Sequence, residues 1–159
     1  YESPFRNTFL SKLCRKLDNN TLVLVNHIKH GLELEEYLKN SKEKQVYFIR
    51  GEVEVEERDK IKKIMEKDSN VICIAMSSIF STGVNIKNLH NIIFAAGGKS
   101  FIRTVQSVGR GLRKHASKNK LIIFDICDKL RYGLRHSEKR KDIYEKEKIK
   151  YTQSIILEK

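Results

Sequence analysis

The spacing of apolar residues changes repeatedly along the first 126 positions of the chain, between blocks typical of strands and blocks typical of helices. Five short, nearly continuous apolar runs have the character of strands that are covered on both faces. These runs are residues 21–26, 45–49, 71–76, 90–96 and 120–126. Apolar residues at helical spacing mark helices in the stretches 5–17, 31–38, 54–67 and 100–113. Pro4 suits the first turn of the first helix.

This alternation of strands and helices with short connections is typical of one fold class. It predicts an α/β domain with a mostly parallel sheet and helices on both faces, a three-layer sandwich. Ligands of such sheets bind beyond the carboxyl ends of the strands. The loops that follow Asn26, Ile49, Met76 and Ala96 are therefore the first places to look for a functional site.

The chain changes character near Leu130. We predict a domain over residues 1–130 and a basic tail over 131–159. Residues 137–148 are almost all charged, and Glu/Lys pairs four apart would support a solvated helix there. Weak alternation over 150–157 fits a final strand. We interpret the tail as a packing appendage, and we interpret the chain, which begins at Tyr1 without a methionine, as a piece of a longer protein.

The net charge and the length of the apolar runs indicate which kinds of partner the chain could bind. Lys and Arg number 32 against 20 Asp and Glu, a net charge of +12. Such an excess favours polyanions and predicts salt-sensitive binding, although it also fits an ordinary lysine-rich surface. No apolar run approaches the ~20 residues that span a bilayer, and no signal peptide opens the chain, so we expect no membrane partner.

The three cysteines, Cys14, Cys73 and Cys127, lie far apart, and two of them fall inside apolar runs. We expect buried thiols in a reducing, cytoplasmic compartment. Without a CxxC pair, and with scattered histidines, no metal site is expected.

The most informative stretch is QSVGRGLR, residues 106–113. Arg110 and Arg113 are three residues apart, so they project from one face of a helix, and Gly109 and Gly111 leave room for a close neighbour. Arginine stays charged and binds phosphate with a planar fork. An arginine side chain that reaches across a cleft stabilises the charge on a phosphoryl group during its transfer. A helix with two arginines at this spacing is common, so spacing alone favours an ordinary surface helix.

Four segments in order resemble superfamily 2 helicases. The stretch QSVGRGLR resembles motif VI, IAMSSIFSTGVN (74–85) resembles motif V, and TLVLVNHIKHGLELEEYL (21–38) resembles motif IV. Arg50-Gly51 followed by Glu57-Arg58 resembles the intervening block, which often reads histidine-glycine and then glutamate-arginine. The distances along the chain between these four segments are also those of the family. The sequences STGVNIKNLH and VGRGLRKHASK resemble the UvsW-type and RecG-like DNA-remodelling branch.

The resemblance implies a C-terminal RecA-like motor domain that closes over ATP with Mg²⁺, held mainly by a preceding N-terminal RecA-like domain. By position, Arg110 and Arg113 would meet the γ-phosphate, and Gln106 would lie near the nucleotide cleft. Gly83 would allow close backbone approach. Asn85 stands where the family usually has an aspartate near the ribose and the domain interface, so a hydrogen-bonding group is kept but a charge is lost.

The same resemblance implies nucleic-acid contacts. Ser77 would contact a backbone phosphate where many members have threonine, and Asn26 and His27 would make a second contact at the end of the motif IV strand. Short polar residues also serve as helix caps and turns, so Ser77 and Asn26 fit that plainer role too. Lys99 is a further candidate contact. The substrate is expected to be DNA, branched forms included, with RNA left open.

Two other functions compete with the motor domain. One is a stand-alone NTPase, because Gly97-Gly98-Lys99-Ser100 follows a strand as a phosphate-binding loop does, and Ile122–Asp125 (IIFD) resembles an acidic strand. That loop requires a glycine at the position of Ile93, without which backbone amides cannot wrap the phosphates. We therefore expect this chain alone to be inactive on ATP.

The other competing function is a non-enzymatic nucleic-acid-binding module, distinguished by salt-dependent binding that needs no ATPase partner.

Overall fold

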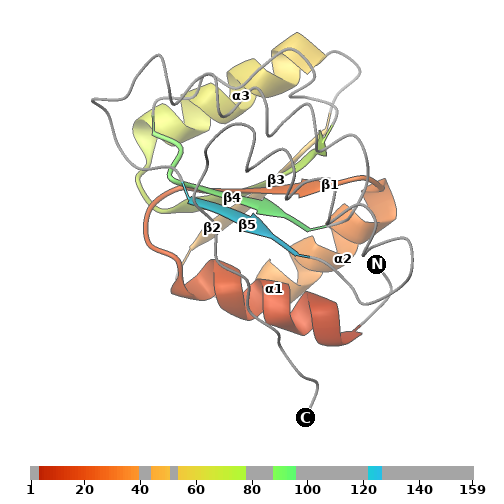
Figure 1. Ribbon diagram of the computed structural model, residues 1–159. Coiled ribbons are helices and arrows are strands. Elements are labelled where there is room, and N and C mark those ends of the chain that lie inside the picture. The colour runs from red at the N-terminus through yellow and green to blue at the C-terminus, as the bar shows by residue number, and fades with distance from the viewer. Residues whose placement is uncertain (1–3, 40–43, 51–53, 78–87, 96–121, 127–159) are drawn as a thin grey trace, which may run out of the picture.

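The computed structural model describes residues 4–39, 44–50, 54–77, 88–95 and 122–126 of the chain (Figure 1). Within them, helices and strands alternate as the apolar pattern predicts. The elements are α1 (Pro4–Lys16), β1 (Thr21–Val25), α2 (Ile28–Lys39), β2 (Gln45–Ile49), α3 (Glu54–Lys67), β3 (Val71–Met76), β4 (Asn91–Phe94) and β5 (Ile122–Asp125). The predicted helix over 100–113 and the predicted tail over 131–159 lie outside the described residues.

The strands form one parallel sheet in the order β2-β3-β1-β4-β5. Helices α1 and α2 cover one face of this sheet and α3 covers the other (Figure 1). The predicted mostly parallel α/β sandwich is therefore confirmed. Because every strand runs the same way, β1, β2 and β3 all end at one common edge of the sheet. This edge, formed by the carboxyl ends of the strands, is the carboxyl edge.

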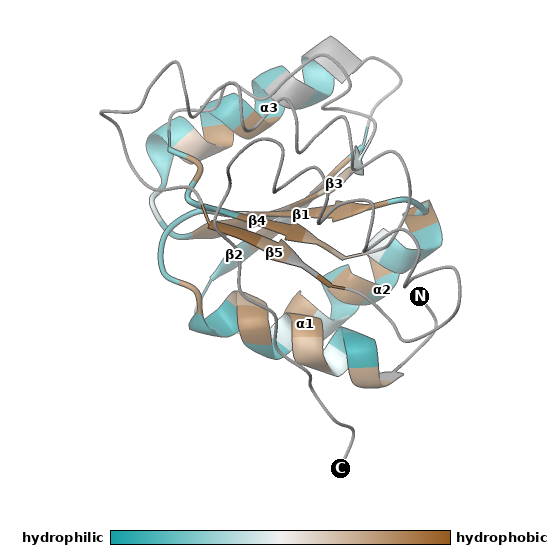
Figure 2. Ribbon diagram, in the orientation of Figure 1, coloured by the Kyte–Doolittle hydropathy of each residue, from teal (hydrophilic) through white to brown (hydrophobic). Residues whose placement is uncertain are grey.

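Strand β1 shows why both faces of the sheet are apolar. Its side chains alternate between the faces, so Leu22 and Leu24 pack with the α3 layer while Val23 and Val25 pack with the α1 and α2 layer. All four are fully buried. Figure 2 shows the strands as predominantly hydrophobic, with hydrophilic residues gathered on the helices. Cys14 and Cys73 are buried as expected, and burial raises the pKa of each thiol to about 12. Cys127 lies outside the described residues.

Helix α2 begins at Ile28, three residues before the helical stretch predicted from the sequence. Gly31, a poor helix former, lies in its first turn, and its backbone N–H bonds to the carbonyl of His27 at 3.2 Å. Packing explains the glycine, because a Cβ atom there would lie 2.3 Å from the ring carbon Cζ of Phe48 in β2. Leu32 points outward and is 40% exposed, while Leu34 and Leu38 are buried.

The side chain of one asparagine forms hydrogen bonds to three elements at the amino edge of the sheet, where the strands begin. The buried side-chain amide of Asn20 donates to the carbonyl oxygens of Met65 at 3.2 Å, Asp68 at 2.9 Å and Asn88 at 3.0 Å. Its Oδ1 atom accepts the backbone N–H of Val71 at 3.1 Å. Asn20 thus joins the end of α3 to the starts of β3 and β4, on the edge opposite the loops of interest. No helix among the described elements is long and apolar enough to cross a bilayer.

Candidate nucleic-acid interface

Two of the predicted phosphate-contacting residues meet at the carboxyl edge of the sheet. Asn26 follows β1 and Ser77 follows β3, and these strands pair in parallel with Val25 level with Met76. The Ser77 hydroxyl donates a 2.7 Å hydrogen bond to Oδ1 of Asn26. Ser77 is buried and Asn26 is half-buried. Sequence reasoning named both residues but not their contact, which joins positions that are 51 apart in the chain.

This hydrogen bond orients the amide of Asn26. Because Oδ1 accepts the hydroxyl proton, the Nδ2 group, which carries two donors, lies on the opposite side of the Cβ–Cγ bond from Oδ1. Side-chain amide and hydroxyl donors are common contacts to phosphate oxygens. His27 comes next and is exposed, just before the first turn of α2. The amino end of that helix carries partial positive charge, which also favours a phosphate.

Beneath this turn, buried polar side chains attach α2 to α1. Asn7 donates through Nδ2 to Glu33 at 3.4 Å, so its Oδ1 faces Nε2 of His30 at 3.2 Å. An oxygen acceptor there requires His30 to be the donor through its Nε2–H group. Burial, reinforced by the nearby positive charge of Arg6, lowers the pKa of His30 to about 4. His30 is therefore neutral near pH 7, and its role is to hold the first turn of α2 in place.

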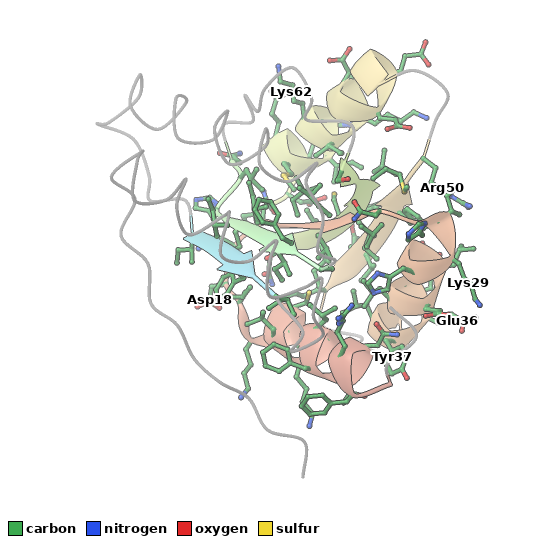
Figure 3. The ribbon with its side chains drawn as sticks, turned by 45° about the vertical axis from the view of Figure 1, so that its right-hand side comes forward. Asp18, Lys29, Glu36, Tyr37, Arg50 and Lys62 are labelled. Carbon is green, nitrogen blue, oxygen red and sulfur yellow. The ribbon has the colours of Figure 1, made fainter. Side chains whose placement is uncertain are left out.

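Arg50 lies at the end of β2, on the same edge of the sheet. Its guanidinium carbon lies 4.9 Å from the centroid of the Phe48 ring, and the side chain is exposed. Figure 3 shows Arg50 and Lys29 projecting from the same side of the molecule, from the end of β2 and the first turn of α2. The sequence drew attention to Arg50 only through its resemblance to a family block. Its proximity to Phe48 follows the two-residue repeat of a strand, a signal that could have indicated the contact.

The remaining predicted site residues lie outside the described part of the chain. They are Gly83, Asn85, Lys99, Gln106, Arg110 and Arg113, and their roles stay predictions. One element of the competing NTPase hypothesis can be placed. Ile93 is fully buried in β4 and pairs with Val23 of β1, so the position where a phosphate-binding loop needs its first glycine lies inside a core strand.

A parallel α/β sheet with polar side chains at its carboxyl edge is an architecture that RecA-like motor domains share with other α/β proteins. Comparison with known proteins places the chain further. The pattern that defines the family "Helicase conserved C-terminal domain" matches residues 6–115. The chain belongs to this family and is a C-terminal helicase domain of superfamily 2, as the four motifs predicted.

Similarity to individual proteins supports the assignment of the chain to this family. The chain is 35% identical over 170 residues to the ATP-dependent DNA helicase UvsW of Enterobacteria phage T4, covering 95% of this chain and 34% of that protein. The crystal structure of T4 UvsW superposes with a TM-score of 0.68 at 33% identity, covering 89% of this chain and 32% of that one. The C-terminal domain of the DEAD-box protein Dbp5 shares the fold, with a TM-score of 0.65 at 14% identity over 89% of this chain and 79% of that chain. The chain thus spans about a third of the length of UvsW.

Proposed function

We propose that this chain is the second motor domain of an ATP-dependent DNA helicase or DNA-remodelling translocase. It contacts the DNA backbone through the carboxyl edge of its sheet. The observation that carries this proposal is the Ser77–Asn26 hydrogen bond, in which Ser77 uses its only hydroxyl proton and so positions the Asn26 amide as the candidate phosphate donor at the ends of neighbouring parallel strands. The relative UvsW is named a DNA helicase, which favours DNA over RNA as the substrate.

The proposed roles in ATP binding rest on residues that match positions in the motifs of the family. ATP with Mg²⁺ would be held mainly by the preceding N-terminal RecA-like domain, and its γ-phosphate would supply the negative charge that draws the two domains together. Arg110 and Arg113 would bind that charge, with Gln106, Gly83 and Asn85 beside the nucleotide. A closed state that depends on γ-phosphate shifts its population when the phosphate leaves, which couples hydrolysis to movement along DNA.

The DNA contact can be tested on this chain directly. Replacing Asn26 by alanine removes a donor to a charged phosphate, a loss of about 1.5–3 kcal/mol, or roughly ten- to a hundredfold in affinity. Ser77→Ala should weaken binding less, because it removes the orienting bond and keeps the Asn26 amide. Both are measured by fluorescence anisotropy with a labelled single-stranded oligonucleotide at fixed salt.

Asn70→Ala is the matched control, since Asn70 is an exposed asparagine that precedes β3 at the opposite edge of the sheet. It should bind as the unmodified chain does. Equal affinities for Asn26→Ala and Asn70→Ala would show that DNA does not lie on the proposed edge.

A second expectation separates the motor domain from a stand-alone NTPase. The purified chain should release no phosphate from ATP above background, with or without DNA, because Ile93 occupies the place of the first loop glycine in a core strand. Phosphate release is followed over hours at millimolar ATP with Mg²⁺. Turnover that is abolished by Lys99→Ala would contradict the motor-domain assignment and support the NTPase.

A further inference from the structure

The first turn of α2 directly follows the Asn26 contact along the chain. Asn26 comes after β1, His27 is next, and the helix begins at Ile28. Asn26 therefore lies between an anchored strand and this turn, and the direction of its side chain changes when the turn moves. The local sequence does little to stabilise the turn, because no acidic residue lies in it and Gly31 is a poor helix former.

A buried polar contact from α1 holds this turn in place. Helix α1 lies beside α2 on one face of the sheet (Figure 1). Nε2 of His30 lies 3.2 Å from Oδ1 of Asn7, and both side chains are buried. Nδ2 of Asn7 donates to Glu33 at 3.4 Å. The side chain of Asn7 thus bonds two residues that are three apart in α2, which restrains both the position and the rotation of the helix.

Burial of apolar surface between the two helices does not require this polar contact. Apolar residues of α1 and α2 already share one buried cluster, which contains Leu10, Cys14, Leu34 and Leu38. A polar pair in such a place has lost its water, which costs free energy. What the pair adds is direction, because a hydrogen bond weakens steeply when its angle changes whereas apolar side chains can slide past one another. Buried polar contacts of this kind can fix the register of neighbouring helices.

Neither member of the pair is placed to contact DNA itself. Both side chains lie buried between α1 and α2, and His30 is neutral near pH 7 because burial lowers its pKa to about 4. An effect of Asn7 or His30 on DNA binding would therefore act through the position of Asn26. Such an effect leaves the salt dependence of binding unchanged, because the number of charges that meet phosphates stays the same.

We propose that Asn7 and His30 are positioning residues for the DNA contact at the carboxyl edge. By holding the first turn of α2 against α1, they keep the amide of Asn26 where a phosphate group binds. Helix α1 then contributes to DNA affinity although its two residues are shielded from the ligand. This inference rests on the proposed function, because it requires that Asn26 contact DNA.

A double-mutant cycle tests the inference, with affinity for a labelled single-stranded oligonucleotide measured at several salt concentrations. Asn7→Ala should weaken binding by about three- to tenfold, as expected for residues that share one network, at an unchanged salt slope. In a chain that already carries Asn26→Ala, the same change should weaken binding by less than about twofold. The reason is that the side chain to be positioned is then absent.

Substitutions of His30 separate positioning from packing. The amide of a glutamine can donate to Asn7 as Nε2 of His30 does, so His30→Gln should keep most of the affinity. His30→Leu fills the space without a donor and should weaken binding about as much as Asn7→Ala does. Ser11→Ala is the matched control, because the buried Ser11 hydroxyl donates to the carbonyl of Thr8 at 3.0 Å within α1. Urea unfolding gives the folded fraction of each variant, and affinities are compared per folded molecule.

The outcomes separate the two proposals. If Asn26→Ala binds as the unmodified chain does, the proposed function fails, and this inference fails with it. If Asn26→Ala weakens binding while Asn7→Ala binds as tightly as the unmodified chain, the proposed function stands and the positioning role is wrong. Equal losses from Asn7→Ala with and without Asn26→Ala would show that α1 does not act through that amide. A loss for Ser11→Ala as large as that for Asn7→Ala, or equal affinities for His30→Leu and His30→Gln, would also refute the inference.

Discussion

Replacing Arg113 by alanine, in a protein that joins this domain to its N-terminal motor domain, should lower ATP turnover by about 10³- to 10⁵-fold. The reason is electrostatic. Charge spreads over the oxygens of the γ-phosphoryl group as it transfers, and a guanidinium that reaches it from the facing domain stabilises this state more than the ground state. An arginine in this proposed role would act mainly on the transition state, so ATP binding should fall far less than turnover does.

Steady-state phosphate release and equilibrium binding of a fluorescent ATP analogue measure the two effects separately. Arg113→Lys keeps the charge but loses the planar fork, and it should recover only part of the turnover. Arg15→Ala is the matched control, since the exposed Arg15 at the end of α1 donates to the carbonyl of Tyr37, at 2.8 Å, away from the carboxyl edge. Turnover of the Arg113→Ala protein within a factor of a few of the unmodified protein would rule out the assigned role.

Asn20→Ala should destabilise the fold by about 3–5 kcal/mol, a large loss for a single side chain. The substitution removes an amide that serves three carbonyl oxygens and one backbone N–H, on Met65, Asp68, Asn88 and Val71. The carbonyl of Met65 keeps a second donor, Nδ2 of Asn88 at 3.0 Å. The buried N–H of Val71 would be left without its partner and would keep the full cost of having lost its water. The end of α3 and the starts of β3 and β4 would also lose the side chain that joins them.

Urea unfolding, followed by circular dichroism, measures this loss as a lower midpoint at an unchanged slope. Asn70→Ala, at an exposed position on the same edge, should change the free energy of unfolding by less than about 0.5 kcal/mol. Asn20→Asp tests the hydrogen-bonding reason, because a carboxylate keeps the acceptor for Val71 but directs negative charge at three carbonyls. An Asn20→Asp protein as stable as the unmodified chain would contradict the explanation.

Much of the fold could be predicted from local pattern. The strands at 45–49 and 71–76 were located at both ends, because apolar residues covered on both faces of a sheet form short runs with abrupt limits. Helix α3 was located equally well from Ile61 and Met65, which lie four apart and face the sheet. The start of α2 was misplaced, since Gly31 disfavours a helix by itself and is accounted for only by the ring of Phe48 from β2.

By itself, the sequence determined the parallel α/β class, the family and the edge at which a ligand should bind, because these follow from residue spacing and from motifs in order. Only the tertiary structure decided which side chains meet at that edge. The Ser77–Asn26 bond depends on the strand order, in which β3 lies beside β1 and brings distant segments together. No pattern along the chain encodes that order, because it is set by which apolar faces can be buried against one another at the same time.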